Sequence, residues 1–365
     1  MKRITWLTAD YFLDVDIQPL DLISRDYSID WHIILPTKNA RYGLDEINNF
    51  PFAKNINIKI HAVDYRSRNL KYILFYLKLC RIIKAEEPDV VYLNLNGFPY
   101  FAFICALLLD ANKTIFAVHQ AKVHQGMRYK IPTILYFRFK FSWFKNFNLF
   151  SVSHGDIFKR EYPKKKSHII PLGLKNFGTS KVSPPEDKIV FFNFGTIIKN
   201  KNIGLLIKAA CNIHEKGIRD FIVKIFGSCD EWNQYAALVR FPEIFQLRIE
   251  SIANDEIPEL FCGSHYLVLP YSSVSQSGPL KIAYNYNIPV IASDLREFKN
   301  EIQDNITGYI FESLNVKALE DTMIKAITNH REMYPKLKAN LRELVKDKYS
   351  SDTLREKYCE MLNSI

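Results

Sequence analysis

The chain has 365 residues, of which 48% are hydrophobic and 24% charged, so it can bury sizeable cores and is not a disordered chain. Its length favours two domains over one. The net charge is +10, and residues 1–180 carry the whole excess, with 26 Lys and Arg against 15 Asp and Glu. The densest basic stretch, Lys122–Lys166, suits an anionic membrane or a nucleic acid, or it is a solvated face without a partner.

The cysteines and the apolar runs indicate in which compartment the protein is found and whether it spans a membrane. The six cysteines lie far apart without a CxxC pair, which indicates a reducing compartment and argues against a disulfide framework or a structural zinc site. The amino-terminal MKRITWLTADYF lacks the apolar core of a signal peptide, and the longest apolar run, Phe98–Leu109, is too short to span a bilayer. We therefore expect a soluble, cytoplasmic protein.

Short apolar runs alternate with amphipathic segments along the chain. In the first half, buried strands are predicted at Ile4–Thr8, Trp31–Pro36, Val90–Asn94, Thr114–His119 and Leu149–Ser153. A helix is predicted within Val63–Lys84, where apolar residues recur at helical spacing before Pro88. In the second half, strands are predicted at Lys188–Phe194, Phe221–Phe226, Gln246–Ile249, Tyr266–Pro270 and Pro289–Ala292. This alternation predicts an α/β protein of two doubly wound domains.

A linker separates the two halves. Asn176–Lys188 has the Gly, Ser and Pro-Pro content of a linker, and the charge balance changes there. We therefore predict a first domain over residues 1–180, a second over 185–348 and a closing helix over 349–365. Neither half has a GxGxxG or a GxxxxGK[ST] motif, which argues against NAD enzymes and P-loop NTPases. Ligands of such domains bind beyond the carboxyl ends of the strands.

Two segments of the second half have features of a phosphate site. In Phe191–Ala210, Gly195 follows a strand and Lys201 precedes a helix; glycine permits close backbone approach, and the ammonium and the helix N-terminus both attract phosphate. In Ser251–Asp294, the polar loop Tyr271–Gly278 follows a strand and leads into a helix whose positive end would face an anion. Each segment alone is also compatible with an incidental turn or a Ser-rich surface loop.

Taken together, the two segments resemble the donor-binding half of family-4 glycosyltransferases with the GT-B fold, in particular bacterial polysaccharide members with a PY…SQSG loop. Gly195 and Lys201 match the G-(x)5-K pattern, and NDEIPELF, LPYSSVSQSG, IPVIASD and NITGYIFE follow in order. The resemblance implies two Rossmann-like domains facing a cleft, the first for the acceptor and the second for a nucleotide sugar. It implies that the donor is bound by Gly195, Thr196, Lys201, Gly227, Asn254, Ile257, Ser275, Gln276, Ser277 and Gly278.

The sequence departs from this family at several donor-side positions. Thr196 stands where many members have an Arg. The two positions that carry paired glutamates in the family are occupied here by Ser275 and by Ile282 or Ala283. Pro279 removes one N–H from the loop that would hold phosphate. A catalytically silent scaffold of the same fold therefore stays an alternative. So does a nucleotide-sugar 2-epimerase, against which the basic first half speaks.

The first half resembles the acceptor side of the same family more loosely, through the HxxxxHxG run at His119–Gly126 and through HIIPLG. His119 ends a predicted strand, and the resemblance implies that it contacts the donor sugar or the acceptor hydroxyl; a structural histidine is the alternative. The loop Thr8–Asp16 is acidic, and one of its carboxylates could bind the acceptor, act as a general base, or cap a helix. The predicted acceptor-binding residues are Asp10, Tyr11, Lys122 and His124.

A mechanism and a location follow from these assignments. His119 and Lys201 are the predicted catalytic residues, and Lys201 would offset charge on the leaving diphosphate, a role that a metal has in other transferases. No carboxylate cluster suits Mg²⁺, so we expect no metal cofactor and a nucleotide-diphosphate sugar as co-substrate. Tyr136–Phe150 interleaves aromatic and basic residues, which suits a membrane interface or a core helix with a basic edge. Nucleic-acid binding ranks lower because no RNA-binding motif accompanies it.

The sequence therefore predicts a metal-independent hexosyltransferase of bacterial surface polysaccharide synthesis, in lipopolysaccharide or capsule. It would transfer a sugar from a UDP- or GDP-sugar to a polyprenyl-diphosphate-linked glycan. It would be peripheral at the inner face of the cell membrane. The resemblance implies that the anomeric configuration is retained.

Overall fold

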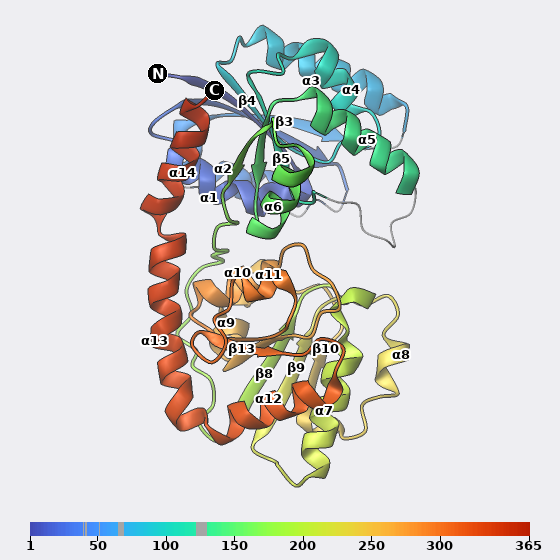
Figure 1. Ribbon diagram of the computed structural model, residues 1–365, viewed down its shortest axis with the longest axis vertical. Helices are drawn as coiled ribbons and strands as arrows, with labels where there is room; N and C mark the ends of the chain where they lie inside the picture. Colours follow the sequence, from blue (N-terminus) through green and yellow to red (C-terminus); the bar gives the residue numbers. More distant parts are fainter. Residues whose placement is uncertain (39, 41, 51, 65–68, 122–129) are drawn as a thin grey trace. The chain divides into compact units, whose positions relative to one another are not determined.

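The computed structural model describes all residues except 39, 41, 51, 65–68 and 122–129 (Figure 1). The chain divides into two compact units. The first contains Met1–Gly173 together with Ser351–Ile365, and the second contains Leu174–Ser350. The end of the chain therefore returns to the unit in which the chain began.

The first unit is built on a seven-stranded sheet in the order β3-β2-β1-β4-β5-β6-β7, in which every neighbouring pair is parallel. The chain direction across the sheet reverses between β1 and β4. The strands are β1 (Arg3–Ala9), β2 (Ser28–Pro36), β3 (Asn57–Val63), β4 (Val90–Asn94), β5 (Thr114–Val118), β6 (Asn146–Leu149) and β7 (Lys166–Ile169). The helices are α1 (Leu13–Ile23), α2 (Leu44–Asn48), α3 (Lys71–Ala85), α4 (Phe101–Leu108), α5 (Lys130–Trp143), α6 (Val152–Glu161) and α14 (Ser351–Asn363).

Helices cover both faces of this sheet. One core contains buried side chains of α1, α2 and α14, packed on the face that carries Trp6 and Trp31. The other core contains side chains of α3, α4, α5 and α6, packed against Leu7, Leu93 and Phe116. All five residues of β4 are buried, as expected of a central parallel strand covered on both faces.

The second unit has a six-stranded parallel sheet in the order β10-β9-β8-β11-β12-β13, which reverses between β8 and β11. Its strands are β8 (Ile189–Phe194), β9 (Phe221–Phe226), β10 (Phe245–Arg248), β11 (Tyr266–Leu269), β12 (Val290–Ser293) and β13 (Gly308–Phe311). Its helices are α7 (Ile203–Glu215), α8 (Asn233–Ala236), α9 (Ile257–Cys262), α10 (Gly278–Asn285), α11 (Arg296–Lys299), α12 (Val316–Thr328) and α13 (His330–Tyr349). One core packs under α7 and α12, and the other under α9, α10 and α11.

The predicted fold class is confirmed, one predicted strand needs correction, and three edge strands were missed. The strand expected at Leu149–Ser153 ends at Leu149, because Ser151 caps α6, its Oγ accepting from His154 N at 3.3 Å. The helix predicted within Val63–Lys84 is confirmed as α3, Lys71–Ala85, and Val63 ends β3. The edge strands β3, β7 and β13 were not predicted as strands.

No helix in the described part of the chain is long and apolar enough to cross a membrane.

Candidate active site

Two glycines shape the carboxyl edge of the second sheet. Gly195 follows β8 with φ +94°, and Gly227 follows β9 with φ +149°, both in the region that favours glycine. A Cβ on Gly227 would lie 2.4 Å from the Gly195 carbonyl oxygen, so the two turns approach too closely for any side chain. Gly195 N also donates to Phe226 O at 2.9 Å. The backbone beyond β8 is thus left uncovered by side chains from its neighbour.

Lys201 reaches back to the turn at Gly195. It ends the 3₁₀ turn Lys199–Lys201, and its Nζ lies 3.2 Å from where a Cβ on Gly195 would stand. The ammonium is 5.6 Å from the centre of the Tyr271 ring, and Tyr271 is buried beyond β11. Burial lowers the pKa of Lys201 to about 8. Among the described residues no carboxylate pairs with this ammonium, so an anion bound at the turn would meet a poorly solvated positive charge.

The polar loop after β11 is tied to the same region. Ser272 N donates to Asn200 O at 2.8 Å, and Asn200 Nδ2 donates to Ser273 O at 3.1 Å. Ser277 is buried and caps α10, because its Oγ accepts from Leu280 N at 3.3 Å. The loops after β8 and β11 therefore meet where the strand order reverses, which is where ligands of doubly wound sheets bind.

The other predicted donor residues have distinct environments. Thr196 is exposed beside Gly195, whereas Ser275, Gln276 and Gly278 are partly buried in and after the loop that precedes α10. Asn254 begins a 3₁₀ turn at Asn254–Glu256. The Ile257 side chain is buried in the core with Phe194 and Phe226, so only its backbone is available to a ligand there.

The departures from the family pattern have structural explanations. Pro279 lies in the first turn of α10, where a missing N–H costs no helical hydrogen bond. Ile282 and Ala283, where the resemblance places the second glutamate, are buried core residues of α10. Between them and the loop, Lys281 is buried and binds Tyr349 Oη at 2.5 Å and Glu301 Oε2 at 3.1 Å. A carboxylate at position 282 or 283 would therefore point into this core.

In the first unit, the partly buried His119 ends a chain of hydrogen bonds that is otherwise buried. Its Nε2 lies 2.8 Å from Asn94 Oδ1, at the ends of the adjacent strands β5 and β4. Asn94 Nδ2 donates to Asp16 Oδ1 at 2.8 Å, and Thr8 Oγ1 donates to Asp16 Oδ2 at 2.7 Å. Trp31 Nε1 donates to Thr8 Oγ1 at 2.8 Å. Because Asn94 turns its amide nitrogen to Asp16, its oxygen faces His119, and Nε2 carries the proton.

Asp16 anchors this chain. Burial raises the pKa of its carboxyl to about 7, while the hydrogen bonds from Thr8 and Asn94 act in the opposite direction. At 1% exposure it cannot reach an acceptor hydroxyl, so of the three loop carboxylates it is the one that holds Asn94. His119 also stacks on Phe12, with ring centroids 3.8 Å apart and planes at 8°. Its imidazole is thus fixed from one edge and one face.

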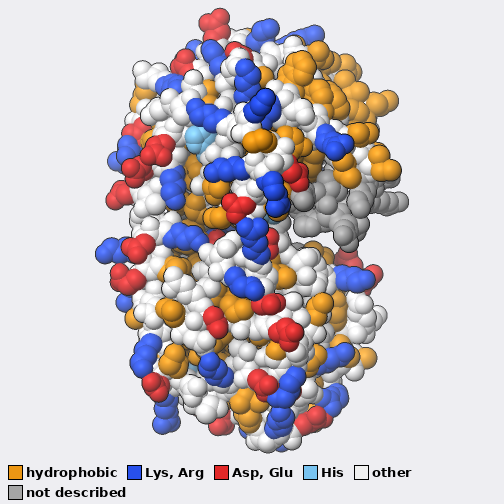
Figure 2. All heavy atoms as spheres, in the orientation of Figure 1, with side chains coloured by type: hydrophobic (Ala, Val, Ile, Leu, Met, Phe, Trp, Pro, Cys, Tyr) orange, Lys and Arg blue, Asp and Glu red, His pale blue; other side chains and the backbone are white. Residues whose placement is uncertain are grey.

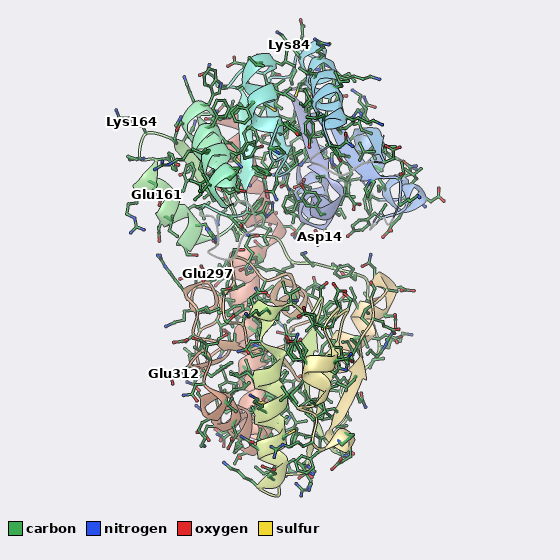
Figure 3. All side chains as sticks on the ribbon, turned by 90° about the vertical axis from the view of Figure 1, so that its right-hand side faces the viewer. Asp14, Lys84, Glu161, Lys164, Glu297 and Glu312 are labelled. Atoms are coloured by element: carbon green, nitrogen blue, oxygen red, sulfur yellow. The ribbon has the colours of Figure 1, made fainter. Side chains whose placement is uncertain are left out.

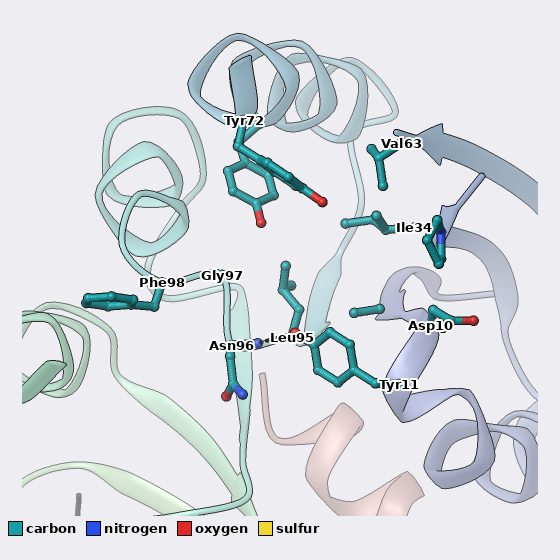
Figure 4. A pocket seen from close by; sticks show the side chains of 12 residues that line it. Asp10, Tyr11, Ile34, Val63, Tyr72, Leu95, Asn96, Gly97 and Phe98 are labelled. Atoms are coloured by element: carbon teal, nitrogen blue, oxygen red, sulfur yellow. Dashed lines mark hydrogen bonds between the residues drawn. The ribbon is translucent and has the colours of Figure 1, made fainter. Parts of the chain in front are cut away.

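A cavity of about 400 Å³ opens at the reversal point of the first sheet, between the ends of β1 and β4. Figure 4 shows Tyr72 reaching from α3 toward the space bordered by Tyr11 and Leu95. Asn96 N donates to Tyr11 Oη at 3.2 Å, which holds the Tyr11 ring at the cavity. The cavity is lined by Ala9, Asp10, Tyr11, Ile34, Pro36, Val63, Tyr72, Tyr76, Leu95, Asn96, Gly97 and Phe98.

The structure brings together some of the predicted residues of the first unit. Asp10 and Tyr11 line the cavity, and His119 lies on the neighbouring turn beside Phe12. Lys122 and His124 lie outside the described residues. Sequence reasoning missed Asn94, whose signal is its position as the last residue of a buried strand. It also missed Tyr72 and Tyr76, which look like ordinary core positions of α3.

A metal site is absent from the described residues, in which no group of three His, Cys, Asp or Glu side chains could hold an ion.

Comparison with known proteins identifies the class. Residues 177–344 match the family described as "Glycosyl transferases group 1". Among solved structures, a glycosyltransferase from Rickettsia africae is 15% identical with a TM-score of 0.73, over 100% of this chain and 98% of the other. Anabaena Alr3699/HepE in complex with UDP and glucose is 12% identical with a TM-score of 0.76, over 100% of both chains. WaaG, a glycosyltransferase involved in lipopolysaccharide biosynthesis, is 14% identical with a TM-score of 0.69, over 100% of both chains. No curated protein sequence matches.

Two parallel α/β units with sites at their strand-reversal points, and structural neighbours of this kind, define a GT-B fold. Residues 177–344, within the second unit, match the group 1 glycosyl transferase family model, and the whole chain has the GT-B fold of its structural neighbours.

Proposed function

We propose that this protein transfers a sugar from a UDP- or GDP-sugar to a glycan acceptor in surface polysaccharide synthesis. The observation that carries the proposal is the Lys201 ammonium, which is largely buried beside the open Gly195 turn. A diphosphate leaving from this turn would accumulate negative charge within reach of that ammonium and of the loop that ends at Ser277. Preorganised positive charge of this kind stabilises a transition state more than a ground state.

The first unit supplies the other half of the reaction. His119 has its ring held by Asn94 and Phe12, so it presents one fixed orientation to a sugar bound next to it. The cavity at Tyr11 is the acceptor site in this proposal. A metal is not needed in this scheme, because Lys201 and backbone N–H groups neutralise the diphosphate. Hexosyl transfer with retained configuration is the form of the reaction that the family resemblance favours.

The decisive experiment is incubation of the purified protein with UDP- and GDP-sugars, with and without EDTA. We expect slow hydrolysis that releases UDP or GDP, undiminished by the chelator. Formation of an epimeric nucleotide sugar without nucleotide release would instead identify a 2-epimerase. Binding of the nucleotide with neither reaction, even with added membrane lipid extracts as a source of acceptor, would leave a silent scaffold and overturn the proposal.

The acceptor is proposed to be lipid-linked and reached at the inner face of an anionic membrane. The outer faces of α4 and α5 expose large apolar side chains, among them Leu107 at 79% and Leu135 at 60% exposed. Figure 2 shows hydrophobic side chains gathered on this flank of the first unit, where Figure 1 draws α4 and α5. Soluble proteins seldom expose such patches unless they bind a partner or a membrane.

Basic residues border the apolar flank. Arg138 and Lys145 are exposed on and just after α5, and Lys164 points outward from the turn after α6 (Figure 3). Lys165 differs, because its Nζ donates to Phe144 O at 2.7 Å, and Lys166 Nζ donates to Ser364 O at 2.5 Å. Apolar side chains with adjacent cations fit an anionic bilayer surface better than either feature alone.

A further inference from the structure

Four of the twelve residues that line the cavity in the first unit are aromatic. Tyr11 is 51% exposed, whereas Tyr72 and Tyr76 are buried on α3 with their ring centroids 5.1 Å apart. Aliphatic side chains, including Ile34 and Leu95, line much of the remaining wall, together with the polar residues Asp10 and Asn96. The space is therefore bounded mainly by aromatic and aliphatic side chains, with phenol hydroxyls, an amide and a carboxylate among them.

The chemistry of these walls suits one class of ligand. A pyranose ring has a face of C–H groups, which packs on an aromatic ring, and an edge of hydroxyls, which bond to phenol and amide groups. A phosphate is disfavoured against aliphatic walls, because it would lose hydration without a matching partner. At about 400 Å³ the cavity is near the lower end of small-molecule sites, which suits one or two sugar rings rather than a long chain.

The loop that forms the cavity floor is built to keep its shape. Gly97 has φ +56°, and a Cβ there would lie 2.2 Å from Phe101 Cβ, so the chain passes directly over α4. Tyr136 Oη donates to Asn96 O at 2.9 Å and accepts from Ala102 N at 3.2 Å. A preformed site of this kind loses less conformational entropy when it binds a ligand.

A continuous aromatic contact links the cavity to His119. Tyr11 packs edge-to-face on Phe12 with ring centroids 4.6 Å apart, and Phe12 stacks on His119 at 3.8 Å. All three belong to the turns that follow β1 and β5. A ligand resting on Tyr11 is thus next to the turn that fixes the histidine.

We propose that this cavity is a subsite for an uncharged pyranose of the acceptor, stacked on Tyr11 and facing Tyr72, and that it selects acceptors ending in such a sugar. The inference rests on the proposed function, because it assigns the substrate class to the acceptor site. The diphosphate of a lipid-linked acceptor lies outside the cavity.

Saturation-transfer NMR on the full chain tests the subsite directly. The probes are methyl glycosides of glucose, galactose, mannose and N-acetylglucosamine, with glucose 1-phosphate and geranyl phosphate as anionic and prenyl comparisons. We expect saturation at the ring C–H protons of at least one methyl glycoside. Tyr11→Ala should weaken that binding about tenfold, equivalent to about 1.4 kcal/mol. Because Tyr11 is half-exposed, Tyr11→Ala should fold. Tyr72→Phe removes only the hydroxyl of a buried ring, so it tests that hydroxyl without creating a cavity.

Matched controls separate the outcomes. Tyr235→Ala, a partly exposed tyrosine of the second unit, should leave glycoside binding unchanged. Binding of geranyl phosphate alone, or no saturation of any methyl glycoside, would overturn the inference. Nucleotide release is measured in the same samples. Glycoside binding without any donor turnover would contradict the proposed function while leaving the subsite intact.

Discussion

Two neighbouring lysines provide a matched pair at the donor site. Lys201 is partly buried next to Gly195, whereas Lys199, on the same 3₁₀ turn, is exposed. If the Lys201 ammonium stabilises the departing diphosphate, Lys201→Ala should lower kcat/KM by roughly 10²-fold or more, as loss of other transition-state charge stabilisers does. Lys199→Ala should stay within about twofold of the original protein, a change below ~0.5 kcal/mol. Steady-state kinetics on folded variants gives both values, and equal losses would contradict the assignment.

His119 and Asn94 are separable by kinetics. His119→Ala should retain nucleotide affinity and lose transfer, because the imidazole belongs to the first unit and the proposed nucleotide site to the second. Asn94→Ala removes the acceptor for Nε2 and should lower kcat by roughly tenfold to 10²-fold through misplacement of the ring. Nucleotide binding is measured by calorimetry and transfer by product release. A fall in affinity with unchanged turnover would make the histidine a structural one.

At the scale of single residues, the sequence predicts those parts of the candidate site that depend on a local pattern. Lys201 and Gly195 are predicted from the sequence because phosphate sites use the local pattern of strand, glycine and helix N-terminus, and the structure places Lys201 Nζ beside the Gly195 turn. Asn94 and Asp16 are 78 positions apart and meet only through the sheet, so no local pattern predicts their bond. The acidic loop made Asp16 a candidate, but its role depends on burial that the sequence does not reveal.

At the scale of elements, the contact between the turns after β8 and β9 can be tested by adding one methyl group. Gly227→Ala places a Cβ 2.4 Å from the Gly195 carbonyl oxygen at a positive φ, whereas Gly217→Ala at φ +85° meets nothing within 4 Å. Gly217→Ala should cost about 1 to 2 kcal/mol from its backbone conformation alone. Gly227→Ala should cost at least about 2 kcal/mol more, because backbone must move. Urea denaturation measures both, and equal values would show that the two turns separate freely.

The strands missed from the sequence share one property. β3, β7 and β13 are all sheet edges, and β3 alternates polar and apolar residues. A search for continuous apolar runs finds strands covered on both faces, such as β4, and overlooks these three edge strands, whereas the edge strand β10 was predicted. The strand predicted at Leu149–Ser153 extends beyond the observed end of β6 for a related reason. Ser151, which follows the apolar residues, caps the helix α6.

Histidines buried in these elements predict acid sensitivity. His32 on β2 and His61 on β3 are joined at 3.0 Å, and His32 Nε2 lies 3.0 Å from Glu86, which also binds Lys59. Burial lowers the pKa of His61 to about 4. It does the same for His265 in the second unit, whose pKa falls to about 4 as well.

The sign follows from proton uptake. Unfolded histidines bind protons near pH 6.5, while these folded ones stay neutral to about pH 4, so the unfolded state binds more protons between the two values. The free energy of unfolding should therefore fall as pH drops through this window. Asp16 opposes this, because its raised pKa gives stability that is lost as pH rises from 3.8 to about 7. Denaturation at graded pH, with His61→Gln flattening the curve, is the measurement; a profile that His61→Gln leaves unchanged would contradict it.

At the scale of the whole molecule, the uneven charge allows the proposed membrane binding to be tested. Replacing Arg138, Lys145 and Lys164 with Glu should weaken binding to anionic vesicles by roughly 100-fold or more, at about 1 kcal/mol per cation near the surface. High salt should release the original protein, because the attraction is screened within a Debye length. Replacing the exposed lysines Lys188, Lys208 and Lys346 of the second unit with Glu should have little effect. Co-sedimentation with vesicles measures all three, and equal losses would mean that net charge alone acts.

The helix α14 has a consequence for the order in which the protein can be made. Leu354, Tyr358, Met361 and Leu362 fill the same core as Trp6 and Leu13, and Lys2 Nζ donates to Leu362 O at 2.8 Å. A ribosome releases the beginning of a chain first, and domains usually fold in that order. Here the first unit lacks part of its interior until residues 351–365 are synthesised, whereas the second is complete at Ser350. The first unit can thus reach its native state only after the whole second unit has been translated.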